Sequence, residues 1–212
     1  MATIMNVLKN PAPAESLKKI LRDSLVEFVA TTLFVFIGTQ SGQSTGWDGF
    51  KEENAVAVAR ILPIAMSFGL AILALAHSIG HLTGGHMNPG VTLMMFFRGQ
   101  LGVLKLVAYW TVQFVGAMLG AALTLGCTSE LDGETSPSGT TFTAGNLAAT
   151  TLNPALSVGN GFLAEFTGSV VFFFVIAQTA LDKRGIATTP FPALPIGLIL
   201  VAVHVCLIPL TG

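Results

Sequence analysis

The stretch from Thr83 to Thr92 holds the residues best suited to act on a small polar molecule. It reads Thr-Gly-Gly-His-Met-Asn-Pro-Gly-Val-Thr and follows an apolar segment long enough to cross a bilayer. Asn88 is a favoured N-cap residue and Pro89 suits the first helical position, so the pattern predicts a short helix over residues 89–97. The positive dipole end of this helix and the Asn88 amide would present hydrogen-bond donors to such a molecule.

The surroundings of this stretch indicate a membrane. Of the 212 residues, 52% are hydrophobic and 10% are charged, and the mean hydropathy is +0.73, whereas soluble domains carry about 25% charged residues. Irregular backbone at membrane depth persists only where protein buries it or where it lines a water-filled cavity. We therefore predict a polytopic all-α membrane protein in which residues 89–97 form a re-entrant half-helix that points into a pore.

Five apolar segments have lengths near the ~20 residues that a bilayer requires. They cover residues 24–41, 61–82, 104–125, 161–181 and 193–210, and polar loops are expected at 42–60 and around Lys183 and Arg184. Most basic residues fall on one side of this arrangement. The positive-inside rule then predicts a cytoplasmic N-terminal tail over 1–23 and an extracellular loop over 127–160.

A weak internal repeat divides the chain into residues 24–126, with three spans and the half-helix, and an incomplete second copy over 161–212. Glu27 and Phe34 in the first copy match Glu165 and Phe172 in the second. Gly69 precedes Thr83-Gly84 by the same interval that separates Gly197 from Thr211-Gly212. An odd number of spans separates the copies, which predicts inverted topology. The register places a second Asn-Pro at positions 216 and 217, so we expect the chain to be truncated before it.

Several classes of function are disfavoured. A net charge of −1 gives no basis for nucleic-acid binding. Two cysteines and four histidines suggest neither a disulfide framework nor a metal site, His77 and His81 being expected at helix ends or in packing. No nucleophile constellation or nucleotide loop is found, so no enzyme activity and no cofactor are expected. The Asn153-Pro154-Ala155 sequence precedes the fourth segment and is predicted to be a loop turn.

These motifs resemble those of aquaporins, the major intrinsic protein family. The strongest matches lie over residues 27–36 and 80–89 and at Thr211-Gly212, and the resemblance covers nearly all of 24–212. It implies an aquaporin-like right-handed helical bundle with inverted repeats, here with five transmembrane helices and one re-entrant half-helix. It also implies a homotetramer in a lipid bilayer, in the plasma membrane or an internal one.

The resemblance assigns roles to individual residues. It implies a pore asparagine motif at Asn88, Pro89 and Gly90 and a selectivity filter at Phe68 and His204. A ladder of carbonyls along the pore is implied at Gly84, Gly85, His86 and Gly212. Glu27 and Glu165 would anchor the loops, and the rings of Phe34 and Phe172 would line the pore. Gly90 stands where the family usually has alanine, and this substitution weakens helix propensity by up to about 1 kcal/mol.

The function implied is passive water conduction with exclusion of protons, since donors at the pore centre would orient each water and a positive field would repel cations. The Phe68–His204 pair resembles the water-selective kind. A truncated subunit that associates with full-length channels without conducting is the main alternative, because a chain ending at Gly212 is not expected to close a pore alone. A glycerol-type facilitator is a weaker alternative, because glycerol-conducting members of the family tend to have a small residue at the His204 position. An ion-coupled transporter is weaker too, since the spans offer no ionisable groups at the midplane beyond Glu27 and Glu165.

Overall fold

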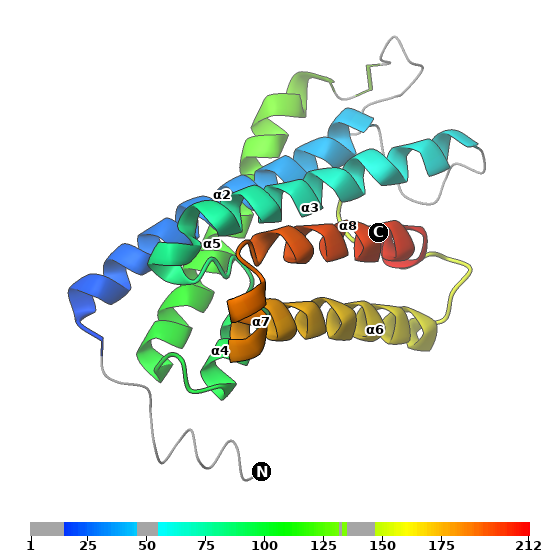
Figure 1. The fold of residues 1–212 in the computed structure, drawn as a ribbon. Coiled ribbons are helices and arrows are strands. Elements are labelled where there is room, and N and C mark those ends of the chain that lie inside the picture. Colours follow the sequence, from blue (N-terminus) through cyan, green and yellow to red (C-terminus); the bar gives the residue numbers. More distant parts are fainter. Residues whose placement is uncertain (1–14, 46–54, 132, 135–146) are drawn as a thin grey trace.

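The protein is built from helices of very different lengths (Figure 1). The structure, a computed structural model, describes residues 15–45, 55–131, 133–134 and 147–212, apart from the side chains of 55–58 and 183. The elements are α2 (Leu17–Thr45), α3 (Ala55–Thr83), α4 (Pro89–Phe97), α5 (Val103–Thr128), the 3₁₀ turn η1 (Ser129–Leu131), α6 (Val158–Ile176), the π-helical turn η2 (Ala177–Leu181), α7 (Lys183–Thr188) and α8 (Ala193–Thr211). These residues include no strand, and the all-helical prediction is confirmed.

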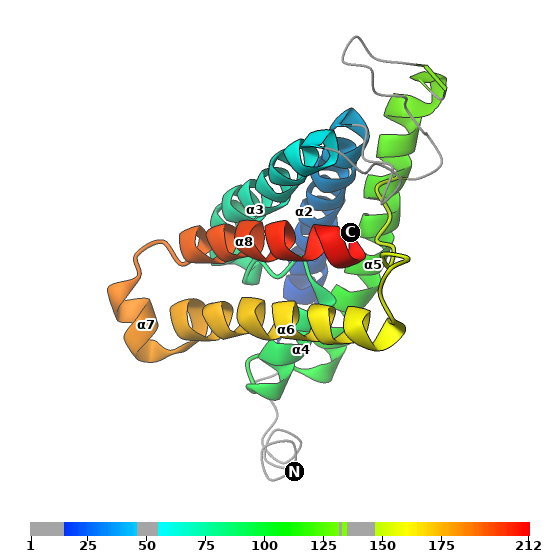
Figure 2. The ribbon, with the colours of Figure 1, turned by 90° about the vertical axis from the view of Figure 1, so that its right-hand side faces the viewer.

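Small residues allow the long helices to approach closely. Helix α2 packs against α5 and α3, α3 packs against α8, and α8 lies beside α6 (Figures 1 and 2). At the α2–α5 crossing, a Cβ atom on Gly120 would lie 2.6 Å from the Thr32 carbonyl oxygen, so only glycine fits there. Gly116 lies one turn away and meets the Phe28 carbonyl in the same manner. The Gly116–Gly120 pair is therefore the contact point between these two helices.

The two repeats meet through matched glycines. A Cβ atom on Gly69 of α3 would lie 2.6 Å from the Gly197 carbonyl oxygen, and one on Gly197 of α8 would lie 2.7 Å from the Gly69 carbonyl oxygen. Each repeat thus presents the same residue to the other, as in a self-complementary two-fold contact.

Four helical stretches are long and apolar enough to cross a membrane, namely Ala59–Thr83, Val103–Leu131, Val158–Leu181 and Ala193–Thr211. Helix α2 has the length, with 29 residues, but is not in this set, because polar residues occur along it. Most of them face inward, where Asp23, Ser24 and Glu27 are buried. Its outward face exposes Leu21, Leu25, Val29, Leu33 and Ile37 at four-residue spacing. The first predicted span, residues 24–41, is thus a helix with an apolar outer face and a polar inner one.

The sequence prediction placed helix ends too close to the apolar segments. Helix α3 begins at Ala55 and α2 ends at Thr45, so the predicted 42–60 loop is partly helical. Helices α5 and α6 likewise shorten the predicted 127–160 loop. Lys183 and Arg184, predicted to lie in a loop, begin helix α7, which the Asp182 carboxylate caps by accepting a 2.8 Å bond from the Arg184 N–H. Polar residues can extend a helix beyond its apolar run when their side chains bond to its own backbone, as in the 2.9 Å Thr45–Ser41 bond.

Candidate functional site

The segment between α3 and α4 is an irregular backbone held inside the bundle. Gly84 and Gly85 have φ angles of +94° and +63°, and Met87 has +46°. A Cβ atom on Gly85 would lie 3.1 Å from the backbone of Ala76, so glycine is needed there for conformation and for space. Met87 has no such freedom, so its left-handed backbone must be held by its surroundings.

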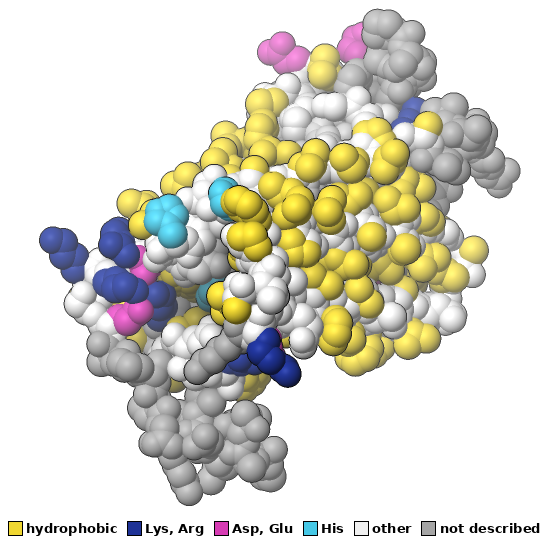
Figure 3. Space-filling view, viewed as in Figure 1, with side chains coloured by type: hydrophobic (Ala, Val, Ile, Leu, Met, Phe, Trp, Pro, Cys, Tyr) yellow, Lys and Arg dark blue, Asp and Glu magenta, His cyan; other side chains and the backbone are white. Residues whose placement is uncertain are grey.

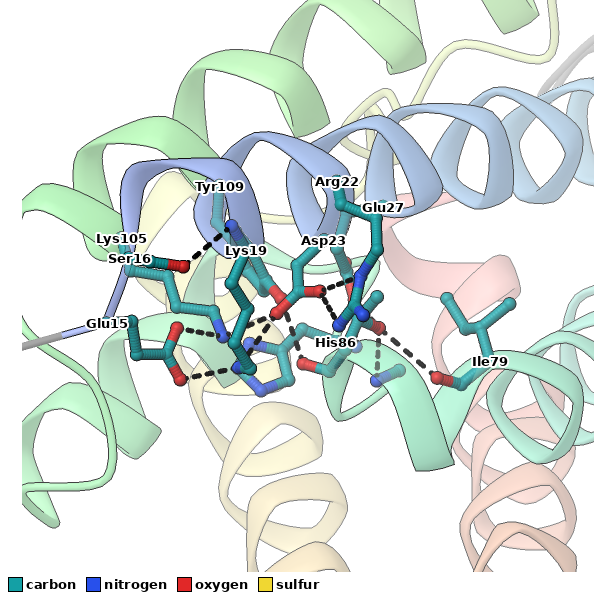
Figure 4. Close-up of polar contacts among 12 residues, drawn as sticks. Glu15, Ser16, Lys19, Arg22, Asp23, Glu27, Ile79, His86, Lys105 and Tyr109 are labelled. Atoms are coloured by element: carbon teal, nitrogen blue, oxygen red, sulfur yellow. Dashed lines mark hydrogen bonds and ion pairs between the residues drawn. The ribbon is translucent and has the colours of Figure 1, made fainter.

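Glu27 supplies that hold. Its carboxylate is 0% exposed and accepts four hydrogen bonds. One oxygen accepts from the Thr83 hydroxyl at 2.7 Å and the His86 N–H at 2.9 Å, and the other accepts from the Met87 N–H at 2.7 Å and the Gln113 amide at 3.1 Å. Figure 4 shows Glu27 reaching from α2 toward His86. Two of the four donors belong to the irregular segment, and Thr83 ends α3 directly before it, so one side chain of α2 fixes its path.

Three further buried residues complete this support, and sequence reasoning did not identify them. The Tyr109 hydroxyl donates to the Thr83 carbonyl at 3.0 Å, and the Gln113 amide donates to the Thr92 hydroxyl at 3.0 Å. The Thr92 hydroxyl also lies 3.0 Å from Nδ1 of His86. Gln113 was detectable in principle, because an amide inside an apolar segment needs polar partners.

Asn88 caps α4 with its side-chain oxygen. That oxygen accepts from the Gly90 N–H at 2.7 Å and the Val91 N–H at 3.3 Å, which leaves the Asn88 amide group as a donor. On the other flank, the Trp110 indole N–H donates to the Pro89 carbonyl at 2.9 Å. A Cβ atom on Gly90 would lie 2.7 Å from the end of the Phe173 ring, so glycine makes room here for an aromatic neighbour.

A cavity of about 540 Å³ opens beside this segment. Helices α3, α4, α5, α6 and α8 all contribute to its wall. The residues of interest on it are Gly84, Gly85, His86, Asn88, Lys105 and Phe172. The irregular backbone and the cap of α4 therefore border a space large enough for several water molecules.

A cluster of charged side chains lies beside the cavity, at the start of α2 and α5 (Figure 4). The Lys105 ammonium is 2.8 Å from the Glu15 carboxylate and 2.9 Å from that of Asp23. Lys19 also contacts both carboxylates, and its hydrogen bond to Glu15 raises the pKa of Lys19 to about 12. Burial acts to raise the pKa of Glu15, but bonds from Lys105 and Lys19 outweigh it and keep that pKa below its usual range. These pairs connect the chain before α2 to the start of α5.

The structure brings Phe68 and His204 together away from the half-helix. Their rings are stacked with centroids 4.7 Å apart, and the Phe34 ring meets Phe68 edge-on at 5.6 Å. Nδ1 of His204 lies 2.9 Å from the Leu200 carbonyl, which can only accept, so Nδ1 carries the proton. Phe172, matched to Phe34 in the repeat, is instead buried on the cavity wall.

Glu165 has surroundings unlike those of Glu27. It is exposed and accepts one hydrogen bond from a described residue, the hydroxyl of Thr211, which matches Thr83 in the repeat. Gly212 directly follows Thr211, and its N–H donates to the Ile208 carbonyl at 3.1 Å. The Asn153 turn lies at the same end of α8, where its amide donates to the Pro209 carbonyl at 3.0 Å.

The fold and this site define a multi-pass membrane protein of the channel type, with a re-entrant half-helix bordering an internal cavity. The family model of the major intrinsic proteins matches residues 14–212, and the chain belongs to this family. It is accordingly an integral membrane protein and not an enzyme. Within the described residues, no group of three His, Cys, Asp or Glu side chains is arranged to hold a metal ion.

Named relatives place the chain among aquaporins. It is 32% identical to Aquaporin-1 of Homo sapiens over 200 residues, which are 94% of this chain and 69% of the relative. It is 32% identical to Aquaporin PIP1-5 of Zea mays over 210 residues, covering 95% of this chain and 68% of that protein. The X-ray structure of the aquaglyceroporin from Plasmodium falciparum has the same fold, with a TM-score of 0.71 at 18% identity over 91% of this chain and 75% of that one.

Proposed function

We propose that this protein is a passive water channel that excludes protons and that residues 1–212 hold the inner half of its pore. The observation that carries the proposal is the Glu27-held segment, whose irregular backbone ends at the Asn88 cap on the wall of a cavity of about 540 Å³. Water entering the cavity would meet carbonyl acceptors along residues 84–86 and then the Asn88 amide donor. That order turns the oxygen of each water toward α4. It thereby interrupts the donor-to-acceptor chain of hydrogen-bonded waters along which a proton could pass.

The aromatic residues that lie away from the half-helix α4 support conduction of water over conduction of a larger solute. Phe68 and His204 lie in ring contact, and Phe34 meets Phe68 edge-on. Large rings so close together would leave a small opening, and the second imidazole nitrogen of His204 would be available to a passing water because Nδ1 faces the Leu200 carbonyl. We propose Phe68 and His204 as the selectivity filter. Glycerol facilitation is the second candidate, because the structural neighbour with the same fold is an aquaglyceroporin.

The remaining parts of the proposal concern the setting. The basic residues near the starts of α2 and α5 favour a cytoplasmic location for that end of the bundle. The cavity would then open to the cytoplasm, and the Phe68–His204 pair would lie toward the outside. Assembly as a homotetramer is proposed from the family alone.

The test is the substitution Asn88→Asp in protein expressed from its complete coding sequence. Asp is as good an N-cap as Asn, so the two bonds to α4 persist while the amide donor is replaced by a carboxylate. In proteoliposomes, the parent should speed osmotic shrinkage above the lipid background without dissipating a pH gradient. The variant should conduct cations or protons, because a negative charge replaces the Asn88 amide donor at the place where each water is proposed to reorient.

Two controls make the outcome decisive. Thr111→Ala changes an exposed hydroxyl on α5 that bonds to its own helix, and it should leave both rates unchanged. Residues 1–212 alone, which we expect to insert without conducting, test the alternative of a non-conducting subunit. No water flux from the complete protein would refute the proposal, and equal glycerol and water rates would favour the second candidate.

A further inference from the structure

Two histidines lie one helical turn apart at the edge of the cavity. His77 and His81 are exposed residues of α3, and both border the space of about 540 Å³ beside the half-helix. Figure 3 shows histidine side chains on the surface beside the charged side chains at one end of the molecule. Residues four apart on a helix have Cβ atoms about 5–6 Å from each other. The two imidazoles can therefore converge on one point in the mouth of the cavity.

Both rings have nitrogens free for a ligand. In the described part of the chain neither imidazole forms a hydrogen bond or an ion pair, and the His77 ring packs against the Phe191 ring with centroids 5.7 Å apart. The other two histidines differ, because Nδ1 of His86 contacts Thr92 and Nδ1 of His204 contacts Leu200.

We propose that His77 and His81 together bind a divalent transition-metal cation such as Ni²⁺ or Zn²⁺, with water in its remaining positions. Neutral imidazole suits these ions, and two histidines four residues apart on one helix face are a known arrangement for holding zinc. Calcium and magnesium should bind poorly because they prefer oxygen ligands.

The basic group nearest to this place is already paired. Lys105 is the basic residue on the cavity wall, and its ammonium is paired with two carboxylates. The ion-paired group consists of three cations, Lys19, Arg22 and Lys105, and two carboxylates, Glu15 and Asp23. A bound ion therefore meets cations whose charge is largely offset by pairing, and it would lie at the mouth of the proposed route, where it would slow water.

Binding is tested by titrating Ni²⁺ into detergent-solubilised protein and measuring the heat released. The protein carries no histidine tag, and the exposed Cys127 and Cys206 are replaced by serine because thiols also bind soft metals. The parent should bind one Ni²⁺. His77→Ala and His81→Ala should each weaken binding at least about tenfold, since each leaves a single ligand. Ser78→Ala, an exposed neighbour on the same helix, is the matched control and should bind normally.

The consequence for transport rests on the proposed function and has its own readout. Ni²⁺ should slow osmotic shrinkage of proteoliposomes that contain the parent and should have no effect on His81→Ala. Equal Ni²⁺ affinity in the parent and both histidine variants would overturn the site. Binding without slowing would overturn the inhibitory role. A metal-free parent that conducts no water would instead refute the proposed function, and the heat titration would be unaffected.

Discussion

Replacing Glu27 with glutamine should loosen the segment between α3 and α4 while the helices stay in place. The carboxylate accepts four bonds and donates none. Glutamine keeps one acceptor oxygen and turns the other into an NH₂ group that faces two donors. Thr83 can rotate its hydroxyl and Gln113 can turn its amide, but the N–H of His86 or of Met87 would remain unpaired in a site with no solvent.

The magnitude follows from that unpaired group. A buried donor without a partner costs about 1–3 kcal/mol, and the bonds that remain lose the strengthening that a charged acceptor gives. We expect a loss of about 3 kcal/mol in total, which for a chain of this length lowers the melting temperature by about 6–12 °C. The loss should be local, because the α2–α5 and α3–α8 glycine contacts do not involve Glu27.

Two measurements check this, with a control that the chain itself provides. Thermal unfolding in detergent gives the melting temperature, and amide hydrogen exchange reports the opening of His86 and Met87. Glu165→Gln changes the matched residue of the second repeat, which is exposed and bonded to Thr211. It should shift the melting temperature far less.

A comparable shift in both glutamine variants would refute this reasoning. It would mean that the loss of a charge matters, rather than the loss of the four-bond acceptor. Unchanged exchange at His86 and Met87 in Glu27→Gln would refute it as well, because the irregular backbone would then be held by other contacts.

Three further changes have defined outcomes. Gly120→Ala should destabilise the protein by about 1–3 kcal/mol in thermal unfolding, because the new Cβ atom meets the backbone of α2. Gly126→Ala is the control: its Cβ atom would have no neighbour within 4 Å, so the change should be neutral or should stabilise the protein by up to about 1 kcal/mol. The pKa of Glu15 is lowered from its usual 4.5, so its pairing with Lys105 stabilises the protein above pH 4.5, and this stabilisation is lost as the pH falls through the lowered pKa. The melting temperatures of the parent and of Glu15→Gln should therefore differ at neutral pH and converge in acid. A difference that stays constant with pH would contradict this. His204→Gly should admit glycerol to proteoliposomes while water conduction persists, and an unchanged glycerol rate would remove His204 from the filter.

The sequence predicted most accurately the helix ends that are marked by particular residues, such as a cap residue followed by proline. Helix α4 spans the expected residues 89–97 because Asn88 and Pro89 specify its start. The boundaries of α2, α3 and α6 were less accurate, since hydropathy locates the apolar run and not the polar turns that continue the helix beyond it. Helix α7 was missed because its six residues carry no apolar period.

The site shows a similar division. The segment around Asn88 was visible because glycines, a cap residue and proline are local signals. Tyr109, Gln113 and Thr92 were not, because their roles depend on α5 lying against the end of α3 and against α4, which no local pattern states. The difference between Glu27 and Glu165 was also hidden, since the repeat makes them look equivalent while their hydrogen-bond partners differ.

If the protein conducts water as proposed, the Glu27 arrangement has a consequence for how that flow depends on temperature. Two backbone N–H groups of the irregular segment and the Thr83 hydroxyl at the end of α3 are already bonded before any molecule arrives. A passage whose polar groups are already in place does not rearrange when a water molecule enters it. The activation energy for permeation should therefore stay close to that of diffusion in liquid water. If the segment had to refold for each molecule, the rate would climb far more steeply on warming. The buried carboxylate thus keeps the proposed passage usable in the cold.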